Sequence, residues 1–225
     1  MRFWWSHPRP RLRGPRPGLP GRSVPALLAI HHVQLGLEPG PLADRQRRLG
    51  CIAEGRFDDA IREAARAEHD DLNGPAARIV AGRAAIQLRD LGRAEAALRS
   101  LDVSGWRGAA LGLHRDALAA GVAALDGRWG EAAPAFADAW RRYRELRLDV
   151  SLAVSALDCL AVAPPGEPLA EMAAREARAI LEREGATAYF VQLERLLADR
   201  AASGNAAGDQ RRAAARNDDR AATTG

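Results

Sequence analysis

Paired carboxylates, scattered histidines and two cysteines are the residues of this chain whose types could do chemistry. The triplet His114-Arg115-Asp116 has the order found in a phosphoryl-transfer catalytic loop, but that loop needs an asparagine five residues after the aspartate, where Gly121 stands. It also needs a lysine, and all 33 basic residues are arginine. The missing lysine further excludes a Walker phosphate-binding loop and a Schiff-base lysine. We therefore attribute the triplet to chance or to a helix surface.

The paired acids Asp58-Asp59 and Asp70-Asp71 are candidates for acid–base or metal chemistry. Neighbouring residues on a helix do not face each other, so neither pair can clamp a single group. Asp58-Asp59 better suits a helix N-terminus, where carboxylates are favoured, and Asp70-Asp71 suits a connecting loop. We expect no catalytic residues and therefore no enzyme.

Histidine and cysteine positions give no metal site either. His31-His32, His69 and His114 have no spacing that would bring them to one ion. Cys51 and Cys159 lie far apart without cysteine neighbours, so both are expected to be small buried apolar residues. We predict no metal and no cofactor, and the scarcity of cysteine favours a reducing, cytoplasmic compartment.

The net charge of +4 is unevenly distributed along the 225 residues. Residues 1–40 contain six arginines and one acid, whereas residues 41–200 contain 23 arginines and 25 acids. A nucleic-acid protein usually has a basic face on its folded part, so a nucleic-acid partner is not expected. Phe3, Trp4 and Trp5 could stack on bases, with a solvated leader as the alternative. No run of 18 apolar residues exists, so we expect no membrane span and no exported chain.

Composition predicts an all-α fold. Hydrophobic residues make up 47% of the chain but aromatic residues only 5%, and alanine, leucine, arginine and glutamate dominate. These are strong helix formers, whereas the β-branched residues that sheets favour are scarce. The few large side chains recur at helical spacing, which is typical of a buried stripe, and we expect them in the core: Trp129, Phe136, Trp140 and Tyr143.

Proline and glycine content divides the chain into three parts. Residues 1–40 are rich in proline and arginine and predict a disordered leader. Residues 41–200 carry the periodic apolar pattern and predict the folded unit, closed by a C-terminal capping helix. Residues 201–225 lack leucine, isoleucine, valine and aromatic residues, so they predict a disordered tail.

A motif recurs within the folded unit. Gly55-Arg56-Phe57 is echoed by Gly92-Arg93-Ala94 and by Gly127-Arg128-Trp129, at glycine-to-glycine spacings of 37 and 35 positions. Each copy follows one apolar-periodic stretch and opens another, and glycine suits the left-handed residue that ends a helix. The sequence therefore predicts a turn between paired helices, repeated about every 36 positions.

The copies resemble the tetratricopeptide repeat, a helix–turn–helix unit. The resemblance lies in the glycine, the aromatic residue two positions on and the alanine five positions on: Gly55, Phe57, Ala60 and Gly127, Trp129, Ala132. It implies an α-solenoid of antiparallel helical hairpins wound into a right-handed superhelix. In that family the concave groove binds a protein or peptide partner, and by its pattern Arg89 and His114 would face the groove.

Residues 177–186 are similar to the closing hairpin of helical arrays in large bacterial regulators that carry an ATPase or a cyclase. Three functions therefore stay open at this stage. We expect a non-catalytic protein–protein interaction scaffold; the alternative is a sensor fragment of a bacterial transcription regulator or cyclase-linked ATPase. An unrecognised enzyme would require a deep pocket with perturbed titratable groups. Oligomeric state and partner identity are not indicated.

Overall fold

The computed structural model describes residues 48, 50–67, 74–105 and 108–204. Within these ranges the regular structure is helical throughout and contains no strand, so the predicted all-α fold is confirmed there. The predicted leader, residues 1–40, lies outside the described residues, as does most of the predicted tail. The last helix continues past the predicted boundary at residue 200, to residue 204.

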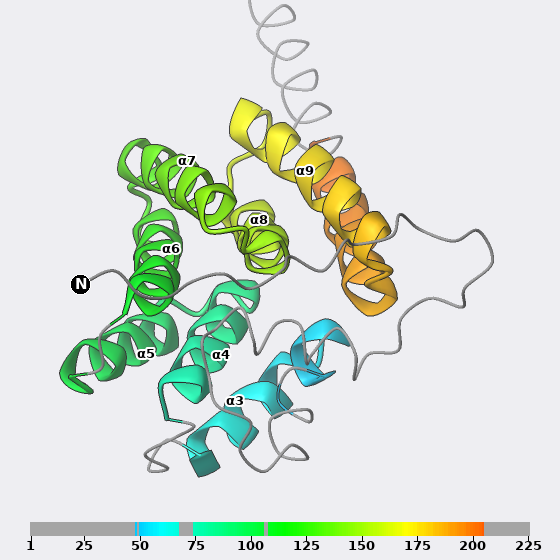
Figure 1. Cartoon of the computed structure of the whole chain (residues 1–225). Helices are drawn as coiled ribbons and strands as arrows, with labels where there is room; N and C mark the ends of the chain where they lie inside the picture. The colour runs from blue at the N-terminus through cyan, green and yellow to red at the C-terminus, as the bar shows by residue number, and fades with distance from the viewer. Residues whose placement is uncertain (1–47, 49, 68–73, 106–107, 205–225) are drawn as a thin grey trace, which may run out of the picture.

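A helical segment at residues 50–53 comes first and a helix at residues 187–204, here called the closing helix, comes last. Between them lie α3 (Phe57–Ala67), α4 (Gly74–Gln87), α5 (Leu91–Val103), α6 (Ala109–Leu125), α7 (Trp129–Glu145), α8 (Asp149–Val162) and α9 (Pro168–Glu184). Short turns connect α4 to α5, α6 to α7, α7 to α8 and α8 to α9 (Figure 1).

Helices in this chain repeatedly end on one left-handed residue. At Gly55, Gly127 and Gly185 the backbone φ is 73°, 78° and 64°. In each case the next amide donates to the carbonyl five residues back, at 2.8 or 2.9 Å, which is the Schellman arrangement. Arg89 (φ 57°) and Arg147 (φ 58°) hold the same position with the same bond, although neither is glycine.

This turn geometry corrects the predicted register of the middle motif. Gly92 lies inside α5, and the left-handed residue before that helix is Arg89. Ala94 consequently matches the buried alanines Ala60 and Ala132, and Leu91 takes the place of the aromatic residue. The predicted register was wrong because Gly92-Arg93, which has the same two residues as Gly55-Arg56 and Gly127-Arg128, lies three positions after the left-handed residue.

Three helices form the interior: α4, α6 and α8 contact one another, and α3, α5, α7 and α9 pack outside them. Figure 1 shows α8 near the middle of the molecule. Every residue of α8 from Val150 to Leu160 is buried, which explains why this stretch is apolar except for Ser151, Ser155 and Asp158. Contact between α4 and α8 is notable because α6 lies between them in the chain, so the inner helices curl around a shared centre.

Glycine lets α4 and α6 cross closely. A Cβ on Gly82 would lie 3.0 Å from the Leu118 side chain, and one on Gly121 would clash with Ile86. The close crossing positions the side chains of α4 and α6 to meet in the interior, among them Arg83 and His114.

The predicted aromatic core is confirmed for three of its four members. Phe136, Trp140 and Tyr143 are at most 1% exposed, whereas Trp129 is partly buried. Phe136 and Trp140 pack with ring centroids 6.1 Å apart, and the Trp140 indole donates to Ser155 Oγ at 3.1 Å. Cys51 and Cys159 are buried free thiols, as predicted.

Candidate binding cleft

A cluster of polar side chains lies at the centre of the inner helices. Arg83 of α4 forms an ion pair with Asp158 of α8, with 3.2 Å between Nη1 and Oδ2. Arg83 Nη2 and the Tyr143 hydroxyl both lie within hydrogen-bond distance of His114 Nδ1, at 3.1 and 3.0 Å. Arginine can only donate, so Nδ1 accepts and the neutral ring carries its proton on Nε2. The cluster thereby joins α4, α6, α7 and α8.

Burial determines the protonation of this cluster. Removal from water raises the pKa of the Asp158 carboxyl to about 6, against the lowering effects of Arg83 and of a 3.0 Å hydrogen bond from Gln87 Nε2. Burial also raises the pKa of Tyr143 well above its usual value. Arg83, His114 and Asp158 are at most 3% exposed, so the cluster has no access to a substrate and serves to fix the helices.

The two predicted groove residues lie in different environments. His114 is fully buried, so in this structure it does not line an open groove; its ring contacts Arg83 of α4 and Tyr143 of α7. Arg89 is exposed at the end of α4 and lines a hollow beside the closing helix. Arg89 and His114 therefore do not share a surface.

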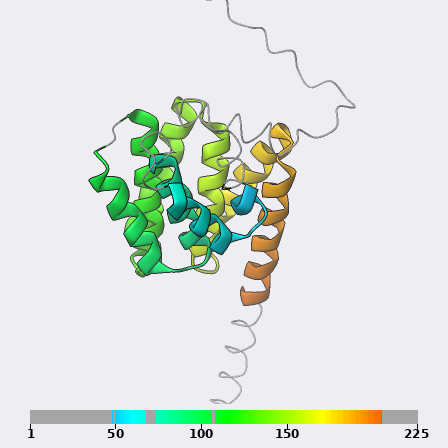
Figure 2. The ribbon, with the colours of Figure 1, turned by 90° about the horizontal axis from the view of Figure 1, so that it is seen from below.

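The first and last described helices meet. Figures 1 and 2 show the segment at residues 50–53 (blue) beside the closing helix (orange). A hollow of about 360 Å³ lies between them, with walls formed chiefly by Phe57 from one side and Val191 and Leu196 from the other. We call this hollow the seam cleft. Gln87 also lines it and connects it to the buried cluster through its bond to Asp158.

A second hollow, of about 230 Å³, continues the seam cleft along the closing helix. The two share Gln87, Leu196 and Asp199, and the second adds Arg89 and Arg200. Arg200 donates to the carbonyls that end α8, at 2.6 Å to Ala163 and 2.8 Å to Pro164 among others, and so anchors the closing helix to α8.

Gln192 is the unusual side chain of the seam cleft. It is only 7% exposed, lines the cleft, and its Oε1 has no hydrogen-bond partner among the described residues. An unsatisfied buried amide costs stability of about 1–3 kcal/mol. Sequence reasoning missed it because one glutamine in an amphipathic helix carries no signal; its environment comes from residues 53–57 and Gln87, far away in the chain.

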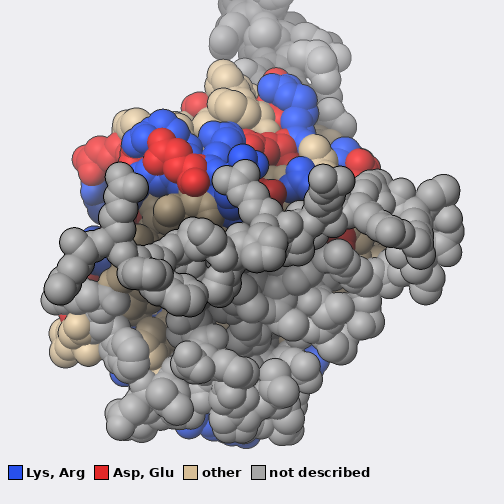
Figure 3. Space-filling view, viewed as in Figure 1, with Lys and Arg blue, Asp and Glu red and all other residues tan. Residues whose placement is uncertain are grey.

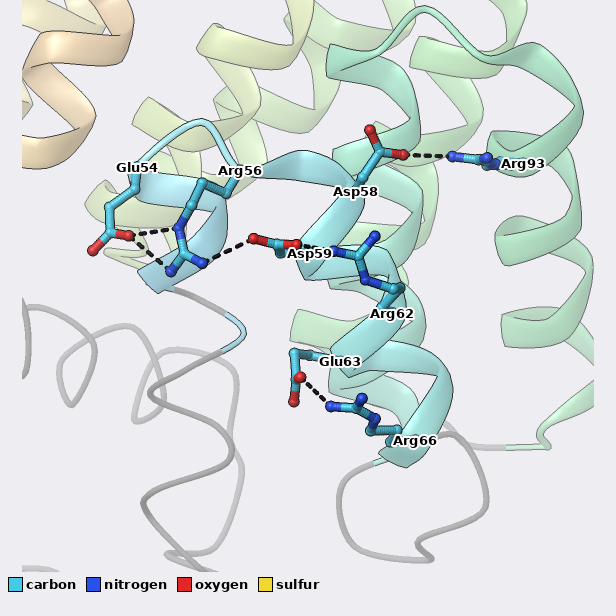
Figure 4. Close-up of polar contacts among 8 residues, drawn as sticks. All are labelled: Glu54, Arg56, Asp58, Asp59, Arg62, Glu63, Arg66 and Arg93. Carbon is cyan, nitrogen blue, oxygen red and sulfur yellow. Dashed lines mark hydrogen bonds and ion pairs between the residues drawn. The ribbon is translucent and has the colours of Figure 1, made fainter.

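Ion pairs connect many of the charged side chains on the described surface. Acidic side chains on α3 form several ion pairs with arginines of α3 and its neighbours, including Arg56–Asp59 at 2.9 Å and Arg93–Asp58 at 2.9 Å (Figure 4). Over α7 and α9, basic and acidic side chains also interleave (Figure 3). Arg89 and Arg195 at the seam have no such ion pair among the described residues.

No family model, curated protein or solved structure matches this chain. Among the described residues, no group of three or more histidine, cysteine or acidic side chains could hold a metal ion. In the same part of the chain, each helix is too short or too polar to cross a membrane.

Proposed function

We propose that this chain is a non-catalytic protein–protein interaction scaffold of the tetratricopeptide type. In this proposal α4–α5, α6–α7 and α8–α9 are antiparallel hairpins of a right-handed superhelix. The left-handed turns at Arg89 and Gly127 support the proposal, because they join the two helices of α4–α5 and of α6–α7 in the same way.

The seam cleft carries the functional part of the proposal. The inner side of the curl, where a partner was expected to lie, is filled by Arg83, His114 and Asp158. Within the described residues the seam cleft is a hollow that adjoins this interior, and it combines apolar walls with Gln192, whose Oε1 has no hydrogen-bond partner there. Sites that recognise partners typically have this combination of apolar area and a few polar groups.

Affinity capture from lysate of the source cells, with the full chain as bait, tests the proposal. Val191 lines the seam cleft and is 63% exposed, so Val191→Arg should remove a specific partner while leaving the fold intact. Val103, 86% exposed on α5, provides the matched control, and Val103→Arg should retain the partner. Equal recovery with both variants, or no specific protein with the unaltered chain, would reject the seam as the binding site.

The alternative is a sensor fragment of a bacterial transcription regulator or of a cyclase-linked ATPase. It draws on residues 177–186, which form the end of α9 and the left-handed turn at Gly185. A reading frame for an ATPase or cyclase immediately upstream of this gene would favour the alternative over a stand-alone scaffold.

A further inference from the structure

The amide of Gln192 defines the hydrogen bonding that a ligand of the seam cleft must offer. A glutamine side chain has both a donor and an acceptor, and the Gln192 Oε1 has no partner within the described residues. A peptide main chain presents one N–H and one C=O per residue, which satisfies both groups of the amide. A hydrocarbon ligand would leave the buried oxygen unsatisfied, at a cost in affinity.

The walls of the seam cleft call for apolar side chains. Phe57, Val191 and Leu196 line the hollow, and the Val191 side chain is 63% exposed. Lining residues of the two hollows recur along one face of the closing helix from Ala188 to Ser203. That face is roughly 22 Å long at 1.5 Å per residue, which matches an extended peptide of about seven residues.

Charge at the rim favours an acidic ligand. Arg89 and Arg195 have no ion pair among the described residues, and Glu54 is already paired with Arg56 at 2.9 Å. Asp199 is the remaining acid in the lining of the two hollows, apart from that paired glutamate. The rim is therefore net positive, although the exposed surface elsewhere on α3 is balanced by ion pairs.

We propose that the seam cleft binds an extended, acidic peptide segment of a partner protein. The Gln192 side chain, whose Oε1 is buried in the free chain, turns its amide toward the peptide main chain. The apolar walls take alternate side chains of the peptide, and Arg89 and Arg195 pair with its carboxylates. In an extended segment successive side chains point to opposite faces, so alternating leucine and glutamate satisfies the walls and the rim together. This inference rests on the proposed scaffold function.

Fluorescence anisotropy with labelled heptapeptides and the full chain tests the assignment. A heptapeptide of alternating glutamate and leucine should bind at least about tenfold more tightly than one of alternating lysine and leucine, or of glutamate and serine. Equal binding of the lysine peptide, or displacement of the glutamate–leucine peptide by a heptathymidylate with equal affinity, would overturn an acidic peptide ligand.

Three variants locate the bound peptide. Gln192→Leu replaces the amide by an apolar group of similar size, and it should lower the affinity for the glutamate–leucine peptide about tenfold. Arg195→Glu should lower the affinity for that peptide and raise the affinity for the lysine–leucine peptide. Arg175→Glu changes the net charge equally at an exposed site on α9 and should bind like the unaltered chain. Circular dichroism melts identify any variant that fails to fold.

The outcomes separate this inference from the scaffold proposal. If the glutamate–leucine peptide does not bind, or binds all three variants alike, the peptide assignment is overturned. Loss of a captured protein on Val191→Arg would in that case still support the seam as a partner site. If both measurements fail, the scaffold proposal fails with the inference.

Discussion

Asp158 makes folding stability depend on pH. Its pKa is about 6 in the folded chain, against an unperturbed value of 3.8, because burial disfavours the carboxylate. The folded state therefore binds more protons than the unfolded state between these values, and stability falls as pH rises from about 4 to about 6. The loss should be on the order of 1–3 kcal/mol.

The measurement is the free energy of urea unfolding of the unaltered chain and of Asp158→Asn across this pH range. The asparagine does not ionise, so the stability of the unaltered chain minus that of the variant should decrease from pH 4 to pH 6. A difference that stays constant or increases would contradict a raised pKa at Asp158.

Arg147 has a conformation that suits glycine. Its φ is 58°, and a left-handed conformation costs a residue with a Cβ about 1–2 kcal/mol. Arg147→Gly should therefore raise the free energy of unfolding by up to about 1 kcal/mol, after the entropy that glycine adds to the unfolded chain. Gly127→Ala, at an equivalent turn with φ 78°, is the opposing control and should lower it. A destabilised Arg147→Gly protein would show that the arginine side chain outweighs the backbone strain.

At the scale of the helices, α3 is underfilled relative to its equivalents. In the corrected register Ala64 of α3 corresponds to Leu98 of α5 and Phe136 of α7. The small side chain lies beside a hollow of about 210 Å³, bounded mainly by Ile61, Ala77 and Ala97.

Filling that hollow should stabilise the chain. Ala64→Leu should raise the free energy of unfolding by about 0.5–2 kcal/mol. Ala60→Leu is the matched control one turn earlier: Ala60 is fully buried and does not line the hollow, so overpacking there should cost about 1–3 kcal/mol. Equal destabilisation by both substitutions, in parallel thermal and urea melts, would show that the α3–α5 hollow does not accept a larger side chain.

Sequence periodicity predicts the helices well because each apolar stripe is local. Phe136, Trp140 and Tyr143 were predicted in the core and are buried. The turn before α5 was predicted three residues late because glycine is the usual signal for a left-handed residue, and here Arg89 holds that place. No local pattern distinguishes an arginine forced into this conformation from one in a helix.

At the scale of the whole molecule, the contacts between helices far apart in the chain could not be predicted from the sequence. The Gln87–Asp158 hydrogen bond joins residues 71 positions apart, and the Arg200 bonds to α8 span 36 to 40 positions. Periodicity predicts which face of a helix is buried but not how strongly successive helices curl. An open curl would leave His114 in a groove; the observed curl brings α4 against α8 and buries it.

Ethoxycarbonylation of histidine by diethyl pyrocarbonate, followed by peptide mass spectrometry of the full chain, tests this closed interior most directly. His114 has no exposed surface, so it should react at least about tenfold more slowly in the native chain than in concentrated urea. Modification of His114 at the same rate in both conditions would show an open groove and contradict the closed curl.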